Sequence, residues 1–526
     1  MNKELEKKIF DYYLNYYKNI CSLKNPEKRA VFRLKEEENE KKRLSRLEDL
    51  NLPLANLKHF IVGAGTGGLA VALKEKYNCQ ISGLEPDEKA LEIIKEKCSA
   101  LNLSPENFKR EYCEKISSPD NSFDIIHCYT VLEHVKDIDK SLDEMIRIVK
   151  PGGKIYINTP NYSFPYEGHY KIPFPTFLPK IFGYFYLLLL GKSPNFLKTI
   201  NFITEKKLDA ILEKKDNISF IRIKEIPSKS SGKLGWLFNF LKFKIGVNPN
   251  QEIVITKLIP RLSILIVNYN SSSFIANSLF LLKKLTKNPY QIFILDNNSK
   301  INDWQNLKKI TAQKPYVFIE RKETNLTGSM AHGTALNCLV EKVNTPYFSV
   351  LDADAIWLKK NWDEILLKEI NEKIKVIGTQ ADSASKPQDF PLIYAAFFET
   401  ETFKKLNIDF RPKDLEKHED TGCELREKYL SAGFKGKVLE MKNTRFYKNG
   451  PFHNLLGVGE YYLNNDFSFP FASHFGRGST LGAAKFYKSP FSFFYRIPIF
   501  GPRLLRLKGM FERKKWISIC QKIINF

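Results

Sequence analysis

Two runs of alternating strand-like and helix-like segments constrain the fold of this chain more than any other feature. The first run begins near His59 and the second at Leu262, with only Ile259, Pro260 and Arg261 between them. Parallel strands need long crossover connections, usually helices, so each run predicts a mainly parallel sheet covered by helices. At 526 residues the chain is also too long for one hydrophobic core. We therefore expect an α/β protein with two domains and almost no linker.

The first run reads as a sheet of short apolar strands. Its expected strands span 59–65, 79–85, 123–135 (a strand that enters a loop), 154–160, 218–226 and 252–258, with a Pro-Gly-Gly turn at 151–153. Residues 160–200 break the rhythm with many Pro, Tyr and Phe residues, as an inserted acceptor cap does. The whole chain is expected to divide into a helical segment over 1–50, a domain over 51–259 that includes the cap, a domain over 262–480, and a basic aromatic tail over 481–526.

A glycine-rich turn follows the first expected strand. Gly63, Gly65 and Gly67 stand between that strand and the next helix, and Glu85 follows Gly65 by 20 residues. Glycines allow a tight turn and a close approach of the backbone to a ligand, and a carboxylate at this spacing meets ribose hydroxyls. NAD-binding folds share this geometry, and a purely structural turn has the same composition. The turn alone leaves these alternatives open.

The phrases that follow the glycines narrow the choice. GLEP, NSFDIIHCYTVLEHVKD and MIRIVKPGGKIYI, together with GAGTGG, resemble class I S-adenosylmethionine-dependent methyltransferases over roughly residues 40–258. The resemblance implies a Rossmann-like seven-stranded fold that binds S-adenosyl-L-methionine. It places Gly63, Gly65 and Gly67 beside the amino-acid end of that cofactor and Glu85 at its ribose.

Three further positions bear on methyl transfer. Members of the family often carry an acidic residue facing the adenine where this chain has Tyr112, and Glu111 or Glu114 is the expected substitute. A hydroxyl acceptor needs a base, and His134 and His169 are the candidates, with a structural role as the alternative for either. His169 lies in EGHYKIPF, which is similar to a stretch of methyltransferases from bacterial surface-glycan pathways.

The second run carries four phrases in a specific order. LSILIVNYN, FILDNNSK, NLTGSMAHGTALN and FSVLDADAIW resemble GT-A glycosyltransferases of the family-2 type over roughly residues 262–440. The resemblance implies a nucleotide-diphospho-sugar transferase fold that binds a nucleotide-sugar donor. In it Val267 and Asn268 flank the nucleotide base, and Asp296 contacts the base or the ribose.

The Asp352-Ala353-Asp354 motif is the expected metal site. Both carboxylates follow a buried strand two residues apart, so they can reach one cation and the donor together. A diphosphate leaving group gains negative charge, which Mg²⁺ or Mn²⁺ neutralises. By the resemblance Asp352 and Asp354 hold this divalent metal, and Asp352 also contacts the nucleotide sugar. Without the upstream phrases, a capping pair of Asp residues would be the simpler interpretation.

An acidic pair follows at the start of a later expected helix. Asp420 is the candidate general base for the acceptor hydroxyl, and Glu419 is the alternative. Negative charge is also favoured at a helix N-terminus, which is the structural explanation for both. His474 is a candidate metal or phosphate contact, again with a structural role as the alternative.

Charge and cysteine content exclude some classes of protein. The formal net charge is +23, but no aromatic RNA platform or zinc-knuckle spacing accompanies it, so a nucleic-acid partner is not expected. The eight cysteines form no CxxC pair, which predicts free thiols in a reducing cytoplasm. The apolar run Ile181–Leu190 is too short to span a bilayer and reads as a core or interfacial helix.

The tail combines basic and aromatic residues. Ten Lys or Arg residues stand between positions 485 and 522, against one acid, Glu512. This composition suits peripheral contact with an anionic membrane, and equally a terminal helix packed on its domain with an exposed basic face.

Together these features predict a cytoplasmic bifunctional enzyme, at the inner face of the cell membrane if the tail binds lipid. It would methylate a hydroxyl and transfer a sugar, with inversion, to a glycan or lipid-linked glycan in surface-polysaccharide biosynthesis. Two alternatives remain. One is an active methyltransferase whose second half only binds glycan, and the other is a basic nucleic-acid-directed methyltransferase.

Overall fold

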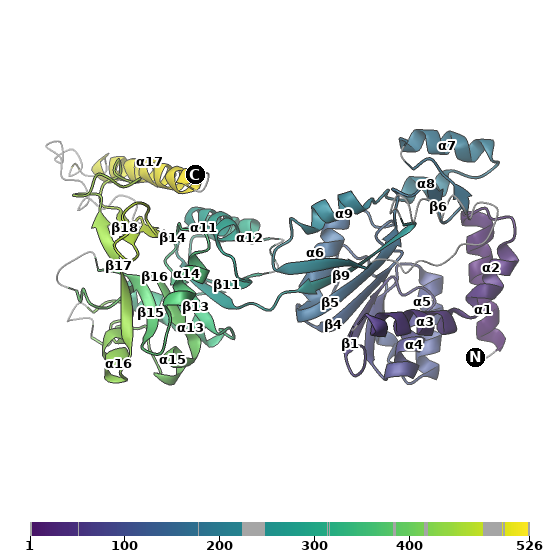
Figure 1. The fold of residues 1–526 in the computed structure, drawn as a ribbon, viewed down its shortest axis with the longest axis horizontal. Coiled ribbons are helices and arrows are strands. Elements are labelled where there is room, and N and C mark those ends of the chain that lie inside the picture. The colour runs from purple at the N-terminus through teal and green to yellow at the C-terminus, as the bar shows by residue number, and fades with distance from the viewer. Residues whose placement is uncertain are drawn as a thin grey trace. The chain divides into compact units, whose positions relative to one another are not determined.

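The computed structural model describes residues 3–50, 52–176, 178–223, 248–312, 314, 316–381, 386–414, 419–476, 497 and 500–523. The chain folds into two compact units, Met1–Leu258 and Ile259–Phe526. Each has its own sheet and its own covering helices (Figure 1).

The first unit is built on a seven-stranded sheet in the order β3-β2-β1-β4-β5-β9-β8. Its strands are β1 Lys58–Val62, β2 Gln80–Leu84, β3 Phe108–Lys109, β4 Phe123–Tyr129, β5 Val149–Pro160, β8 Ile218–Ile223 and β9 Asn250–Lys257. The first five are parallel, whereas β9 runs antiparallel to both β5 and β8. The expected seven-stranded Rossmann-like sheet is therefore confirmed, with the two late strands at its edge.

Helices cover both faces of this sheet, as its alternating side chains require (Figure 1). Phe60 and Val62 of β1 pack with α6 (Ile138–Ile148) and α9 (Glu205–Leu212), whereas Ile61 packs with α3 (Glu36–Asp49), α4 (Gly68–Tyr77) and α5 (Glu88–Ala100). Asp87 and Asp137 cap α5 and α6 by accepting hydrogen bonds from the backbone N–H groups of Ala90 and Lys140.

The Pro-Gly-Gly turn expected at 151–153 lies instead inside β5. The pairing of β5 with β4 shifts there, from Phe123 opposite Val149 to Ile125 opposite Lys154. Gly152 has a positive φ of +81°. The glycines therefore allow a bulge that absorbs the extra residues without ending the strand.

Residues 160–200 form a small layer with its own apolar core. It contains β6 (Tyr166–Glu167), β7 (Ile172–Pro173), α7 (Lys180–Leu189) and α8 (Asn195–Thr199). Buried in its centre are Tyr162, Tyr170, Phe174, Leu187, Leu197 and Ile200. Before the sheet, α1 (Lys3–Asn15), a short π-helix (Tyr16–Ile20) and α2 (Pro26–Arg33) lead into α3.

The second unit is built on a ten-stranded mixed sheet in the order β12-β11-β10-β13-β16-β15-β17-β18-β19-β14. Its strands are β10 Leu262–Asn268, β11 Tyr290–Asn297, β12 Val317–Lys322, β13 Tyr347–Leu351, β14 Ala355–Trp357, β15 Ile374–Thr379, β16 Leu392–Glu399, β17 Lys435–Asn443, β18 Gly459–Tyr462 and β19 Ala472–His474. Strands β10 to β13 are mutually parallel. Their carboxyl ends share one edge, which is where an open α/β sheet holds its ligand.

Helices of the second unit are α11 Ser272–Leu285, α12 Ile301–Thr311, α13 Gly328–Glu341, α14 Trp362–Glu369, α15 Thr400–Lys405, α16 Leu425–Ser431 and α17 Phe500–Ile523. Trp516 and Cys520 anchor α17 in the core beside α11. Within the described residues, no helix is both long and apolar enough to cross a membrane. The tail residues Lys485, Lys488 and Arg496 lie outside the described residues.

Candidate active sites

The first unit contains a cavity of about 400 Å³ at the carboxyl edge of its parallel strands. Its wall combines the glycine turn after β1, Glu85 and Pro86 after β2, and Thr130 and Val131 after β4. Three loops that are distant in the sequence converge because parallel strands end on the same edge of a sheet.

Gly63 and Gly65 line this cavity with left-handed backbones, φ +68° and +55°. A Cβ added at Gly63 would lie 2.5 Å from Cγ2 of Val131. A Cβ added at Gly65 would meet nothing within 4 Å. The missing side chain at position 65 thus leaves open space beside the backbone, as a bound cofactor requires.

Gly67 serves another purpose and does not line the cavity. It is the N-cap of α4, with a φ of +88°, and a Cβ there would lie 2.6 Å from Cγ1 of Ile94 on α5. The glycine therefore permits close packing of two helices, and its contact with the cofactor stays a prediction.

Glu85 ties the glycine turn to the second strand. Its buried carboxylate accepts hydrogen bonds from the N–H of Gly65 at 2.7 Å and of Asp87 at 2.9 Å. Burial raises its pKa. Two oxygens offer about four lone-pair positions, so ribose hydroxyls can still bind beside these two contacts.

The structure shows which of the residues considered for the adenine contact line the cavity. Tyr112 lines the cavity but is 63% exposed, with the Lys136 ammonium over its ring. Glu114 also lines the cavity, and its Oε1 accepts a hydrogen bond of 2.6 Å from the backbone N–H of Lys136. Glu111 accepts from the Ser117 N–H and is not part of the wall. Of the two substitutes, Glu114 is the one at the cavity.

The structure brings the two candidate bases of this unit together. The rings of His134 and His169 are 5.0 Å apart, edge to face, and His134 lines the cavity. Nδ1 of His169 lies 2.7 Å from Oε1 of the buried Glu167. Burial opposes the ionisation of Glu167, but the hydrogen bond with His169 holds its pKa below the ordinary value. With Nδ1 engaged, Nε2 of His169 is the atom suited to proton transfer.

Glu133 completes this cluster and was not singled out from the sequence. Its Oε2 accepts a 2.9 Å hydrogen bond from Thr159, and its Oε1 has no hydrogen-bond partner among the described residues. Burial raises the pKa of Glu133 to about 7, and burial, then His169, lower the pKa of His134 to about 4. The ligand-type atoms of Glu133, His134 and His169 all lie within 4.8 Å of one another. Burial therefore favours the protonated form of Glu133 and the neutral form of His134.

The N-terminal helices close one side of the same cavity. Arg33, Glu36, Glu40 and Arg43 all line it. The buried Glu36 carboxylate accepts hydrogen bonds of 2.7 Å from Thr66 in the glycine turn and from Lys97. Sequence reasoning missed this network, because nothing local distinguishes Glu36 from the neighbouring acids of the EEENE segment.

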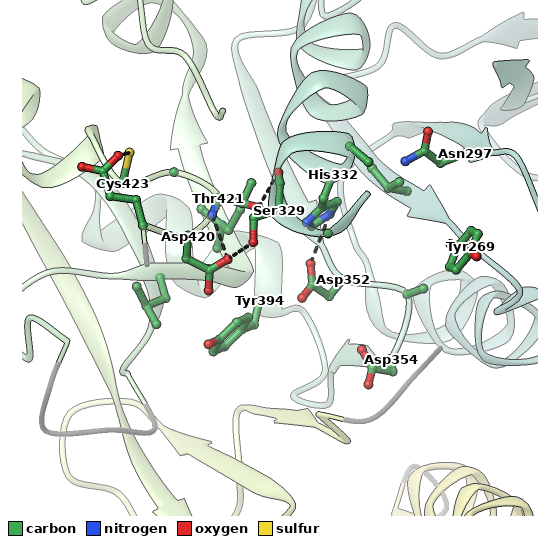
Figure 2. Close-up of a pocket in the computed structure, with 18 of the residues that line it drawn as sticks. Tyr269, Asn297, Ser329, His332, Asp352, Asp354, Tyr394, Asp420, Thr421 and Cys423 are labelled. Atoms are coloured by element: carbon green, nitrogen blue, oxygen red, sulfur yellow. Dashed lines mark hydrogen bonds and ion pairs between the residues drawn. The ribbon is translucent and has the colours of Figure 1, made fainter. Parts of the chain in front are cut away.

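The second unit contains a larger cavity of about 1020 Å³. Val267 and Asn297 line it from β10 and β11, Asp352 and Asp354 from the loop after β13, and Ser329 and His332 from the start of α13. Figure 2 shows Asp352 and Asp420 pointing into one space from opposite walls, with Tyr394 beneath them.

Asp352, Asp354 and His474 form the expected metal cluster. Their ligand-type atoms lie within 4.8 Å of one another, with Nε2 of His474 3.4 Å from Oδ1 of Asp354. Oδ1 of Asp352 is buried without a hydrogen-bond partner in the described part of the chain, and burial raises the pKa of Asp352 to about 6. Two carboxylates and an imidazole, with one carboxylate oxygen that accepts no hydrogen bond, fit a divalent cation. His474, which comes from the distant strand β19, is thereby part of the donor set.

Asn268 and Asp296 lie beneath this cavity and do not line it. Both are fully buried, and the Asn268 amide donates to Asp296 at 3.0 Å, to Ser299 at 3.1 Å and to Asp303 at 2.9 Å. These two side chains therefore do not reach the cavity, and their contact with the donor stays a prediction. They join the ends of β10 and β11, and the neighbouring Tyr269 and Asn297 face the cavity in their place.

Asp420 faces the cavity in a defined polar setting. Its Oδ1 accepts from Ser329 at 2.7 Å (Figure 2). Its Oδ2 accepts from Lys386 at 2.8 Å. Burial opposes its ionisation, but the hydrogen bonds from Lys386 and Ser329 hold its pKa below the ordinary value. Asp420 is therefore a carboxylate able to accept a proton.

Glu419 is committed elsewhere, although it borders the same cavity. Its Oε2 accepts from the backbone N–H groups of Lys413 and Asp414, both at 2.8 Å, and these bonds lower its pKa. Its carboxylate thus holds a loop together, which favours Asp420 as the base. Lys386 and Tyr394 escaped sequence reasoning because neither belongs to a motif, and Ser329 lies in the phrase NLTGSMAHGTALN but was given no role.

Comparisons with known proteins find a different domain family in each of the two units. Residues 61–157 match the family model described as a methyltransferase domain, and residues 263–430 match the model described as glycosyl transferase family 2. A ubiquinone biosynthesis O-methyltransferase of Coxiella burnetii is 32% identical over 20% of this chain and 45% of its own length. A demethylmenaquinone methyltransferase of Bacteroides fragilis is 36% identical over 18% of this chain and 40% of its own. The chain therefore spans less than half the length of these curated relatives.

Several solved structures are similar to part of the chain, and one of them is a glycosyltransferase. It is a mannosyltransferase, PcManGT from Pyrobaculum calidifontis, in complex with GDP-Man and Mn²⁺. It has 16% sequence identity and a TM-score of 0.28, and it covers 34% of this chain and 54% of its own. A likeness of this strength supports no statement about function.

Proposed function

This chain joins a methyltransferase domain to a glycosyltransferase family 2 domain, and we propose that it is a bifunctional enzyme of glycan or surface-polysaccharide biosynthesis. One site transfers the methyl group of S-adenosyl-L-methionine to a hydroxyl. The other transfers a sugar from a nucleotide donor to a glycan, with inversion and with the help of a divalent metal. The observation that carries the proposal is the second cavity, where a cluster of Asp352, Asp354 and His474 faces the ionised Asp420.

In the second cavity, Asp352, Asp354 and His474 would hold Mg²⁺ or Mn²⁺. When bound, such an ion supplies positive charge beside the departing diphosphate. Asp420 accepts the proton of the acceptor hydroxyl, and the hydroxyl oxygen bonds to the anomeric carbon. The bond from that carbon to the diphosphate oxygen breaks in the same displacement, which inverts the anomeric centre. Lys386 and Ser329 orient the Asp420 carboxylate through their hydrogen bonds.

In the first cavity, Gly63, Gly65 and Glu85 would position S-adenosyl-L-methionine, which supplies an electrophilic methyl group when bound. Nε2 of His169 accepts the proton of the acceptor hydroxyl, because the Glu167 carboxylate engages Nδ1. The hydroxyl oxygen bonds to the methyl carbon as the carbon–sulfur bond breaks. The layer over residues 160–200 acts as the acceptor cap, since it carries His169.

The tail supports a site of action at the inner face of the cell membrane, in the cytoplasm. Phe500, Leu504, Leu507 and Phe511 are exposed along one side of α17, opposite the buried Trp516. Arg503 and Lys514 lie on one edge of this apolar stripe, and Lys508 and Lys515 on the other, at helical spacing. A helix with an apolar stripe between basic edges suits an anionic lipid surface, where a lipid-linked acceptor would be found.

A mass-spectrometric screen of the intact protein tests this function. The protein is incubated with S-adenosyl-L-methionine, Mg²⁺ or Mn²⁺, a panel of nucleotide sugars and glycan acceptors with and without a lipid anchor. We expect products that gain the mass of a methyl group and of a sugar, and loss of the sugar product alone when a chelator is added.

Two outcomes would contradict the proposal. If methylation of glycans occurs while every nucleotide sugar stays intact, the second half binds glycan without catalysis. If only nucleic acid gains methyl groups, with binding that weakens steeply as salt is added, the chain is a nucleic-acid methyltransferase.

A further inference from the structure

Helix α7 presents an apolar face that no described part of the chain covers. Ile181, Phe182, Phe185, Leu188 and Leu189 have between 51 and 86% of their surface exposed. Their spacing places them on one side of the helix. Scattered apolar residues are ordinary on a protein surface, but five large ones on ten residues form a contiguous patch that needs a partner.

The exposure of this face is fixed by the packing of the opposite face. Gly183 and Leu187 are the two buried residues of α7. Leu187 belongs to the small core over residues 160–200, and a Cβ added at Gly183 would lie 2.4 Å from Cζ of Phe174. The helix therefore sits close on its core, and it cannot turn its apolar face inward without losing that contact.

The borders of the patch are polar in a specific way. Tyr184 and Tyr186 are half-buried on its two edges, and Lys180 and Lys192 mark its two ends. Between Glu167 and Glu205 the chain has no Asp or Glu but four lysines, at positions 171, 180, 192 and 198. This segment is thus apolar in the centre, amphipathic at its edges and free of negative charge; Lys180 and Lys192 donate hydrogen bonds to the carbonyls of Ile200 and Ser22, and Lys198 is exposed.

We propose that α7 lies flat in the headgroup region of an anionic bilayer, with its apolar face toward the acyl chains. Ten residues of helix span about 15 Å, which is too short to cross a membrane and long enough to lie in its surface. Tyrosines are favoured at the water–lipid boundary, and the exposed Lys198 can extend toward anionic headgroups. A second copy of the chain would not require a border free of acidic residues, whereas an anionic surface does.

The anchored helix is a short distance from the candidate base. Leu187 of α7 shares a core with Leu197 of α8, and the ring of Phe196 on α8 is 5.1 Å from the ring of His169. This consequence rests on the proposed function: the methyl acceptor is a glycan presented at a membrane surface. It is separate from the tail, because α7 belongs to the first unit and α17 to the second.

Flotation of the full chain with lipid vesicles tests the proposal. The vesicles are phosphatidylcholine with or without phosphatidylglycerol, and the background variant is Leu507→Ser/Phe511→Ser, which removes the α17 contribution. Adding Phe182→Ser/Leu189→Ser should weaken binding to the anionic vesicles by about tenfold or more, since two inserted apolar groups are lost. Lys198→Gln should weaken it by about fivefold on anionic vesicles only.

The matched control is Phe446→Ser, because Phe446 is 87% exposed but stands alone on the second unit. It should leave vesicle binding unchanged. Binding of S-adenosyl-L-methionine by the Phe182→Ser/Leu189→Ser variant shows that the first unit is folded. That readout and vesicle binding are independent of glycan chemistry, so failure of the proposed enzyme function would leave them intact.

Two results would overturn the proposal. The first is equal binding of the Phe182→Ser/Leu189→Ser variant and its background to anionic vesicles. The second is a dimer in light scattering that this substitution dissolves, together with no vesicle binding, which would assign the face to a second copy of the chain.

Discussion

The two cavities prepare for group transfer in different ways. The wall of the first includes two left-handed glycines, and the Glu85 carboxylate accepts a hydrogen bond from the N–H of Gly65. The second is shaped by charged side chains, two aspartates and a histidine facing a third aspartate. A sulfonium donor leaves as a neutral thioether and needs alignment above all, whereas a nucleoside diphosphate leaves with added negative charge that must be neutralised. The difference in construction follows the difference in leaving group.

The largest effect should come from removing a metal ligand in the second cavity. Asp354→Ala should lower the rate of glycosyl transfer by about a thousandfold, because the leaving group loses its counter-charge. Methyl transfer should stay unchanged. Initial rates with the nucleotide sugar found by the screen measure the effect, with Asp466→Ala, an exposed acid of the same unit, as the control. A loss of both activities would break the separation of the two sites.

The raised pKa of Glu133, beside the first cavity, should make the free energy of unfolding depend on pH. Folded Glu133 has a pKa of about 7, above its ordinary value of 4.5. Between these two pH values the folded chain holds a proton that the unfolded chain has released, so stability falls as pH rises through this window. Glu133→Gln has no such proton, so its stability relative to the native chain should increase by up to about 3 kcal/mol.

Urea unfolding at several pH values between 4.5 and 7 measures this difference in stability. The unfolding transition of the first unit is identified as the one that S-adenosyl-L-methionine shifts. A difference in stability that stays constant with pH would show that Glu133 is not a buried neutral acid at the lower end of this range.

Removal of the candidate base should affect only methyl transfer. His169→Gln should lower its rate by about a hundredfold, and Glu167→Gln by about tenfold, because Glu167 acts through the orientation of His169. Glycosyl transfer should not change. The rates of the two variants distinguish the two roles, because His169→Gln removes the proton acceptor whereas Glu167→Gln only frees its ring to reorient. An unchanged rate in His169→Gln would leave alignment alone as the source of catalysis.

A pair of glycine substitutions sharpens the role of backbone in the first cavity. Gly67→Ala places a methyl group against Ile94 and should cost about 2 kcal/mol of stability, with little change in cofactor affinity of the folded fraction. Gly65→Ala meets open space and should cost about 1 kcal/mol, from its left-handed backbone, while weakening cofactor binding. Calorimetric titration and thermal unfolding separate the two. Equal affinities in both variants would contradict the assignment of Gly65 to the ligand.

The local sequence predicted much of the fold. The two sheets follow from apolar strands that alternate with helices, and the pairing of Gly65 with Glu85 follows from their spacing. The bulge at 151–153 did not, because a Pro-Gly-Gly segment has the same composition whether a partner strand continues past it or not. Gly67, Asn268 and Asp296 belong to the right motifs, yet packing directs them away from the cavities.

By itself, the sequence determined the two-domain α/β architecture, the edge of each sheet where ligands bind, and the acidic pair Asp352 and Asp354. Only the tertiary structure decided which side chains join them. Lys386 stands in no motif, and His474 and Glu167 had no partner in the sequence that fixed their place; all three reach their sites through the fold of distant strands and loops. Periodicity and spacing report contacts within a few turns of the chain, whereas a catalytic cluster depends on long-range packing that local pattern does not encode.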